Sequence, residues 1–262
     1  MFETTRFESE QRLLSSLVVA AGLSAFGAMM VFVAPGILAE VDIDALLEQV
    51  PPAFVEAFDL EQMGTLEGFV AIEIYQFMWL LGIGAYLAYS AAGTIAGDEE
   101  AGRLDTLLAA PISRTRLLVE KYLALLTPIL LVNVLVFVVI YGAAAVIDDP
   151  MSATDLAMVH ALSVPYFLCC GAFGMLASVA APRRIYAEGI AAGGIIGAFL
   201  VQTLVSGTDL NWLGTVAPMR YYEPLVVLTT GTYDLAGGAI LLAGSLGLLV
   251  ASILVFRRAD LQ

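Results

Sequence analysis

The chain has 262 residues, 60% of them hydrophobic, and a formal net charge of −14 from 25 acidic and 11 basic residues. Its mean hydropathy of +0.89 excludes an ordinary soluble domain of this length. A helix needs about 20 apolar residues to cross the hydrocarbon core of a membrane. We therefore predict an all-α membrane protein with one transmembrane domain, residues 1–262, and we expect no nucleic-acid partner.

Six apolar stretches are long enough to span a membrane. They cover residues 13–34, 69–96, 122–147, 156–181, 185–206 and 233–256. Because backbone polar groups in hydrocarbon must find partners within their own segment, these stretches are predicted to be helices. Ten of the eleven Lys and Arg residues fall on one side of the membrane, and only Arg220 falls on the other. This bias predicts that both termini are cytoplasmic.

The segments before and between the first two spans are expected to lie at the membrane surface. Residues 1–12 read as an interfacial amphipathic segment, and residues 35–68 form an outer segment. The outer segment contains two short helical pieces, Ile43–Val50 and Phe54–Leu60, which either cover an external opening or form a packed cap. The second outer segment, 207–232, holds two prolines and is predicted to follow a broken, partly re-entrant path.

The acidic composition indicates the surroundings in which the protein works. Acid-rich chains with a single lysine are typical of proteins from very salty media, so we expect a halophilic archaeal source. Because the outer acids show no ligand spacing, a metal site is not expected. The neighbouring Cys169 and Cys170 are expected to be buried as small apolar residues.

Catalytic motifs are missing from the sequence. His160 is the only histidine, which excludes a His-Glu-x-x-His zinc site, and it is expected at the interfacial end of a helix. The sole lysine, Lys121, follows Glu120, so the chain has no Gly-x-x-x-x-Gly-Lys phosphate loop. We expect neither a catalytic site nor a bound cofactor in this chain.

A polar segment separates the second and third spans. Residues 97–121 read GDEEAGRLDTLLAAPISRTRLLVEK. Three acids open it, where a helix N-terminus favours negative charge, and leucines follow at i, i+3 and i+4. Pro111 marks the end of the short helix, and Ser113 is a suitable N-cap for the next one. The pattern predicts an amphipathic helix over about 98–110, outside the membrane, with three leucines available for docking.

Small and polar residues inside the spans give two further hypotheses. Gly189, Gly193 and Gly197 recur every four residues and form one stripe, which serves helix packing within the subunit or a dimer seam. Asn133 and Gln202 are the few polar groups in mid-span and are candidates for lining a translocation path.

The polar segment resembles the cytoplasmic link of the permease subunit of type-2 ATP-binding-cassette (ABC) exporters. That family's link reads acid-x-Glu-x-Gly-Thr-Leu-Glu-x-Leu-Leu-x-x-Pro-x-Ser-Arg, soon followed by Lys. The positions that match are Asp98, Glu100, Gly102, Leu104, Asp105, Leu107, Leu108, Pro111, Ser113, Arg114 and Lys121. Arg103 stands where the family usually has Thr, which puts local contacts in doubt.

The resemblance implies that the short helix is the coupling helix, which docks on a separate ATPase subunit. The docking residues would be Asp98, Glu100, Gly102, Arg103, Leu104, Asp105, Leu107, Leu108, Pro111 and Arg114. Mg-ATP would be bound by that partner, and a second permease subunit, identical or different, would complete the pathway. Spans one, two and five would then switch it between inward-open and outward-open arrangements. An apolar or amphipathic cargo is expected, with export the expected direction.

Within this family, the outer segment before the second span resembles the subgroup of the nitrous oxide reductase maturation permease. Two other classes remain open from the residues alone. One is an ion-coupled secondary transporter, and the other is a membrane assembly factor that uses the polar segment as its docking helix. Co-purification of an ATPase separates the exporter from both.

Overall fold

Six helical segments are long and apolar enough to cross a membrane, which confirms the predicted all-α membrane fold. They are Glu3–Glu40, Leu66–Glu100, Arg114–Val146, Ala153–Ala180, Arg184–Val205 and Leu235–Arg258. The computed structural model describes residues 3–40, 45, 47–51, 55, 60–109 and 112–258. No strand occurs among these residues. Residues 43, 44 and 46 of the predicted piece Ile43–Val50, and residues 54 and 56–59 of the predicted piece Phe54–Leu60, lie outside them.

Two of the six segments, Leu66–Glu100 and Arg114–Val146, are built from more than one helical element. The membrane-spanning elements are α1 (Glu3–Glu40), α4 (Leu66–Val70), the π-helix η2 (Ala71–Ile83), α5 (Gly84–Glu100), α7 (Arg114–Leu123), α8 (Leu126–Val146), α9 (Ala153–Ala180), α10 (Arg184–Val205) and α12 (Leu235–Arg258). The shorter elements between them are η1 (Leu60–Gly64), α6 (Arg103–Ala109), η3 (Asn211–Val216), η4 (Pro218–Tyr221) and α11 (Pro224–Thr230).

The first span differs from the sequence prediction. Residues 3–12 are not a separate helix, because α1 runs without a break from Glu3 to Glu40, and their interfacial position stays a prediction. No proline interrupts its first eight turns, and Arg6 pairs with Glu10 one turn away on the same helix face. Residues 3–12 therefore extend the first span at its N-terminal end.

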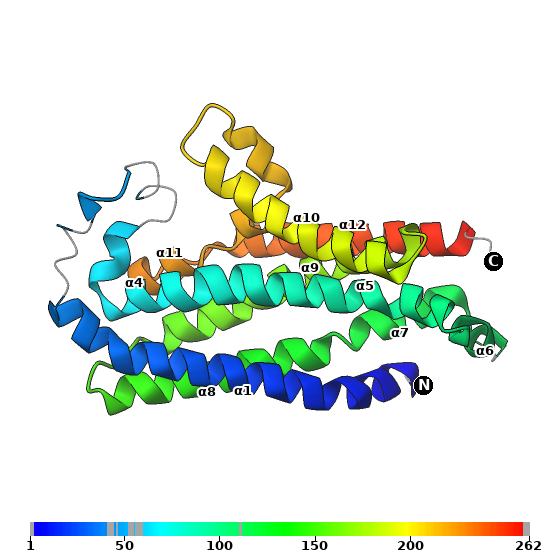
Figure 1. Ribbon diagram of the computed structural model, residues 1–262, viewed down its shortest axis with the longest axis horizontal. Helices are drawn as coiled ribbons and strands as arrows, with labels where there is room; N and C mark the ends of the chain where they lie inside the picture. Colours follow the sequence, from blue (N-terminus) through cyan, green and yellow to red (C-terminus); the bar gives the residue numbers. More distant parts are fainter. Residues whose placement is uncertain are drawn as a thin grey trace.

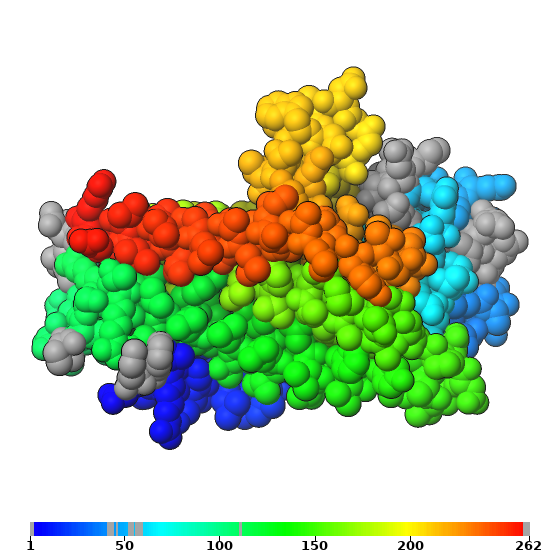
Figure 2. Space-filling model, turned by 180° about the vertical axis from the view of Figure 1, so that it is seen from behind, coloured from blue at the N-terminus to red at the C-terminus, as the bar shows by residue number. Residues whose placement is uncertain are grey.

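Helix α9 lies at the centre of the bundle. It packs against α5 on one side and α12 on another, while α1 packs against α8. Both termini and α6 lie at the same end of the bundle, called the α6 end below (Figure 1). The end of α10 that is farther from the α6 end turns away from the bundle. Together with η3 it forms a lobe that stands out from the surface (Figure 2).

The seam between α5 and α9 is a close approach of two long helices. A Cβ atom on Gly174 would lie 2.0 Å from the backbone oxygen of Ala88, a distance that no side chain can occupy. One turn further, the backbone N–H groups of Ile95 and Ala96 both donate to Ser178 Oγ at 3.1 Å. Small residues thus allow two backbones to touch, as in other membrane helix pairs.

The second outer segment is broken, as its prolines predicted. Pro218 and Pro224 occupy the first turns of η4 and α11, where a missing N–H has no cost. Tyr222, between the two, is buried and donates from its hydroxyl to the backbone oxygen of Val159 at 2.9 Å. This burial raises the pKa of Tyr222 well above its ordinary value. The segment is therefore anchored to α9.

The α5–α9 seam gives a test of the fold. Replacing Gly174 with Ala should lower the stability of the purified protein by about 1–3 kcal/mol, because the added methyl group forces the two backbones apart. Gly142→Ala is the matched control, since its Cβ would meet no atom within 4 Å. Thermal unfolding in detergent measures both. Equal melting temperatures for the two variants would contradict the close seam.

Candidate functional site

The short helix begins at Arg103, later than the predicted start at residue 98. Helix α5 continues through Glu100, so the three acids form its last turn. Gly102 then adopts a φ of +64°, the left-handed conformation with which glycine ends helices. The glycine ends one helix before the next begins, so the acids do not lie at a helix N-terminus. Residue 110, where the helix was predicted to end, and Pro111 lie outside the described residues.

The leucines of α6 face the bundle more than the sequence suggested. Leu104 is only 2% exposed and belongs to the core, while Leu107 and Leu108 are half-buried against it. The side chains that face outward are Arg103, Asp105 and Thr106. The expectation that all three leucines are available for docking is wrong for Leu104, because its helix face is already covered by this chain.

Other predicted docking residues fasten neighbouring helices. Arg114 donates to the backbone oxygen of Phe256 on α12 at 2.9 Å and lies over its ring. Glu100 accepts from the backbone N–H of Arg184, the first residue of α10, at 2.9 Å. Ser113 caps α7 as predicted, since its hydroxyl accepts from the N–H of Arg116 at 3.2 Å. These side chains therefore hold α10 and α12 to the neighbouring helices at the α6 end.

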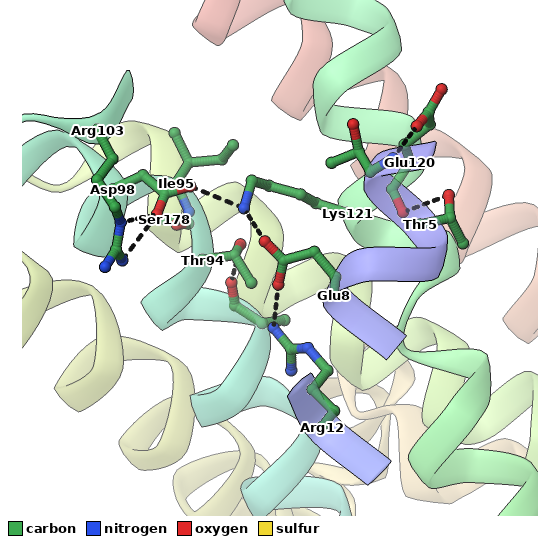
Figure 3. A network of polar contacts seen from close by, with 12 residues as sticks. Thr5, Glu8, Arg12, Thr94, Ile95, Asp98, Arg103, Glu120, Lys121 and Ser178 are labelled. Atoms are coloured by element: carbon green, nitrogen blue, oxygen red, sulfur yellow. Dashed lines mark hydrogen bonds and ion pairs between the residues drawn. The ribbon is translucent and has the colours of Figure 1, made fainter. Parts of the chain in front are cut away.

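A buried ion network lies beneath α6 (Figure 3). The ammonium group of Lys121, whose side chain is 2% exposed, pairs with Asp98 Oδ2 at 2.7 Å and with Glu8 Oε1. Asp98 Oδ1 also pairs with Arg103 Nη2 at 2.9 Å. Arg12 lies 3.8 Å from the other oxygen of Glu8. We call Glu8, Arg12, Asp98, Arg103 and Lys121 the Lys121 network.

A second carboxylate joins the same helices one residue earlier. Glu120, 2% exposed, binds Arg116 Nε at 2.7 Å and accepts from the backbone N–H of Thr4 at 3.0 Å. The hydroxyl of Thr5 donates to the backbone oxygen of Glu120 at 3.0 Å. Burying charges is unfavourable unless each is paired and hydrogen-bonded. Here α1 supplies partners to two neighbouring residues of α7, Glu120 and Lys121.

Sequence reasoning missed the Lys121 network. Glu8 and Lys121 are 113 residues apart, and no local pattern pairs them. The available signal was the composition itself: one lysine in the chain, placed where an apolar span begins, requires a carboxylate partner.

A cavity of about 740 Å³ opens beside the network. Its walls come from α1, α5, α6, α7 and α10, and they combine charged groups, those of the Lys121 network included, with aromatic ones such as Phe7, Tyr86 and Tyr89. Arg184 and Glu188 form an ion pair of 2.6 Å on the α10 wall. The arrangement offers a space with both apolar and charged surfaces.

The two polar groups proposed for the path are not brought together. The amide oxygen of Asn133 accepts from Ser163 Oγ at 2.9 Å and lies 3.1 Å from His160 Nδ1, so it is engaged within the bundle. Gln202 lines a separate cavity of about 150 Å³ between α10 and α11. His160 is 6% exposed and also contacts Tyr75 Oη at 2.9 Å, so its expected interfacial position is wrong.

The glycine stripe of α10 faces away from the chain's own helices. A Cβ atom on Gly189, Gly193 or Gly197 would meet nothing within 4 Å, and the first two residues are exposed. Packing within the subunit, one of the two hypotheses, is therefore wrong for this stripe. The dimer seam stays a prediction.

The comparison with known families agrees with the architecture. The family model described as ABC-2 family transporter protein matches residues 53–261, which include the described helices from η1 to α12. No curated protein matches the chain at a significant level. The matched family consists of membrane transport components rather than catalytic enzymes.

The turn before α6 gives a second test. Gly102→Ala should cost about 1–2 kcal/mol, because an L-residue with a side chain is strained at φ near +64°. Gly102→Asn is the matched control, since asparagine tolerates this conformation best among such residues. Amide hydrogen exchange over residues 99–109 should rise in the first variant and stay near the original in the second. Equal exchange in both would show that the turn does not need glycine.

Proposed function

The chain belongs to the ABC-2 transporter family, and we propose that it is the membrane-spanning permease subunit of an ABC exporter. Family membership implies a partnering ABC ATPase, which would bind and hydrolyse Mg-ATP. The observation that carries the proposal is α6, a short helix between the second and third spans that exposes a polar face at the end of the bundle.

The proposal places the α6 end in the cytoplasm. Basic residues gather at this end, as the positive-inside rule requires. They are Arg6, Arg12, Arg103, Arg114, Arg116, Lys121, Arg183, Arg184, Arg257 and Arg258. We propose that the exposed Arg103, Asp105 and Thr106 contact the ATPase directly, with Leu107 and Leu108 at the rim of the contact. Asp98 and Leu104 would act from below, by holding the helix in place.

A second permease subunit is proposed to pack along α10. The stripe of Gly189, Gly193 and Gly197 is unobstructed and would let two helix backbones approach closely. A twofold axis beside α10 would bring the same face of α10 from each subunit together. This holds for two identical subunits and for two related ones.

For the cargo, we propose an apolar or amphipathic molecule that is exported. The cavity of about 740 Å³ supports this class, because aromatic and charged side chains share its walls. Gln202 has the better support of the two path residues, since its buried Oε1 has no hydrogen-bond partner in the described part of the chain. A halophilic source and a place in the nitrous oxide reductase maturation subgroup are finer proposals, supported by composition and by the outer segment.

The docking face gives a third test. Asp105→Arg combined with Thr106→Arg should reduce co-purification of the ATPase at least about tenfold, because two new cations oppose a contact built for this face. Both residues are exposed, so folding and membrane insertion should not change. Glu10→Arg, a charge reversal at an exposed position of α1, is the control and should bind normally. Undiminished binding by the double variant would remove α6 from the docking site.

A further inference from the structure

We propose that Lys121 is a positioning residue that makes α1 follow the movement of α6 when ATP binds to the partner. This inference rests on the proposed function and adds a transmitting element to it. The connection is continuous: Arg103 begins α6 and pairs with Asp98 on α5, Asp98 pairs with Lys121 on α7, and Lys121 pairs with Glu8 on α1. Three helices thus meet at one ammonium group, and Arg103 joins α6 to it through Asp98 (Figure 3).

Burial makes this connection firm. The side chains of Lys121, Asp98 and Glu8 are 2%, 8% and 15% exposed. Only a small part of each side chain is exposed, on the side that borders the cavity, so separating the charges would leave each of them largely uncompensated. The Arg6–Glu10 pair on the same helix, with exposures of 83% and 62%, has no such constraint because water solvates both ends.

The surroundings of α1 allow it to respond. Near the α6 end, α1 is fastened to α7 through Lys121 and Glu120. The same part of α1 also borders the cavity of about 740 Å³, to which Thr4, Phe7, Glu8 and Gln11 contribute. The N-terminal part of α1 is thus tied to α7 and borders open space, which gives it room to move together with α7. The cavity would then change shape whenever α6 is displaced.

A purely stabilising role for the network makes a different prediction. In that case, loss of a pair lowers stability but leaves the response of α1 to nucleotide intact. In the transmitting role, α1 stops responding while the ATPase stays bound. The two roles therefore separate in a measurement made on α1 itself, since coupling must be shown by a change of state and not by proximity.

The reporter is a single cysteine at Gln11, placed in a chain in which Cys169 and Cys170 are changed to Ala. The permease is purified with its ATPase, and the rate of alkylation by N-ethylmaleimide is compared without nucleotide and with ATP plus vanadate. The rate should change at least about threefold in the otherwise unaltered chain. The change should disappear in Glu8→Gln and in the charge-balanced double variant Glu8→Gln with Lys121→Met, in which Asp98 keeps Arg103.

Two controls complete the experiment. Glu10→Gln removes a carboxylate from the same helix but outside the network, and Lys121→Arg keeps the positive charge; both should retain the nucleotide-dependent change. A full response in either Glu8 variant would overturn the inference, as would an unresponsive reporter in a complex that hydrolyses ATP. A parent chain that binds no ATPase would overturn the proposed function itself, and the inference with it.

Discussion

One buried ammonium group determines how the α6 end is assembled. Lys121 lies in the last turn of α7, and its buried ammonium group pairs with one carboxylate from α1 and another from α5. Each of these carboxylates is shared with an arginine, so no charge in the cluster stands alone. Because a buried charge without a partner is strongly unfavourable, the relative positions of α1, α5, α6 and α7 follow from this requirement.

The same constraint explains the character of α6. A helix of seven residues has too few hydrogen bonds to be stable by itself, so it depends on what fastens it. Leu104 anchors it to the core, and Arg103 anchors it to Asp98. Gly102 supplies the turn that connects it to α5. Its outward face is left polar. A partner that binds this face would act on a helix that Leu104 and Arg103 connect directly to the bundle.

Some of this structure could be predicted from the sequence and some could not. The six spans could be predicted from hydropathy. A span needs an apolar run that is long enough to cross the membrane, and the length of such a run can be read from the local sequence. The start of α6 was misplaced because two local signals competed at residues 98–102: acids that favour a helix start and a glycine that ends one. The glycine prevailed, since its φ of +64° is the conformation that other residues avoid. The Lys121–Glu8 pair and the burial of His160 depend on which helices become neighbours, and no local pattern encodes that.

We propose that this chain works as a permease together with a separate ATPase. The most direct measurement is affinity purification of the unaltered chain from its native membrane, in mild detergent and high salt, with identification of the proteins that elute with it. If the chain is such a permease, we expect a roughly stoichiometric subunit that contains a phosphate-binding loop and hydrolyses ATP. A permease recovered without any ATPase, even after gentle crosslinking in the membrane, would contradict it.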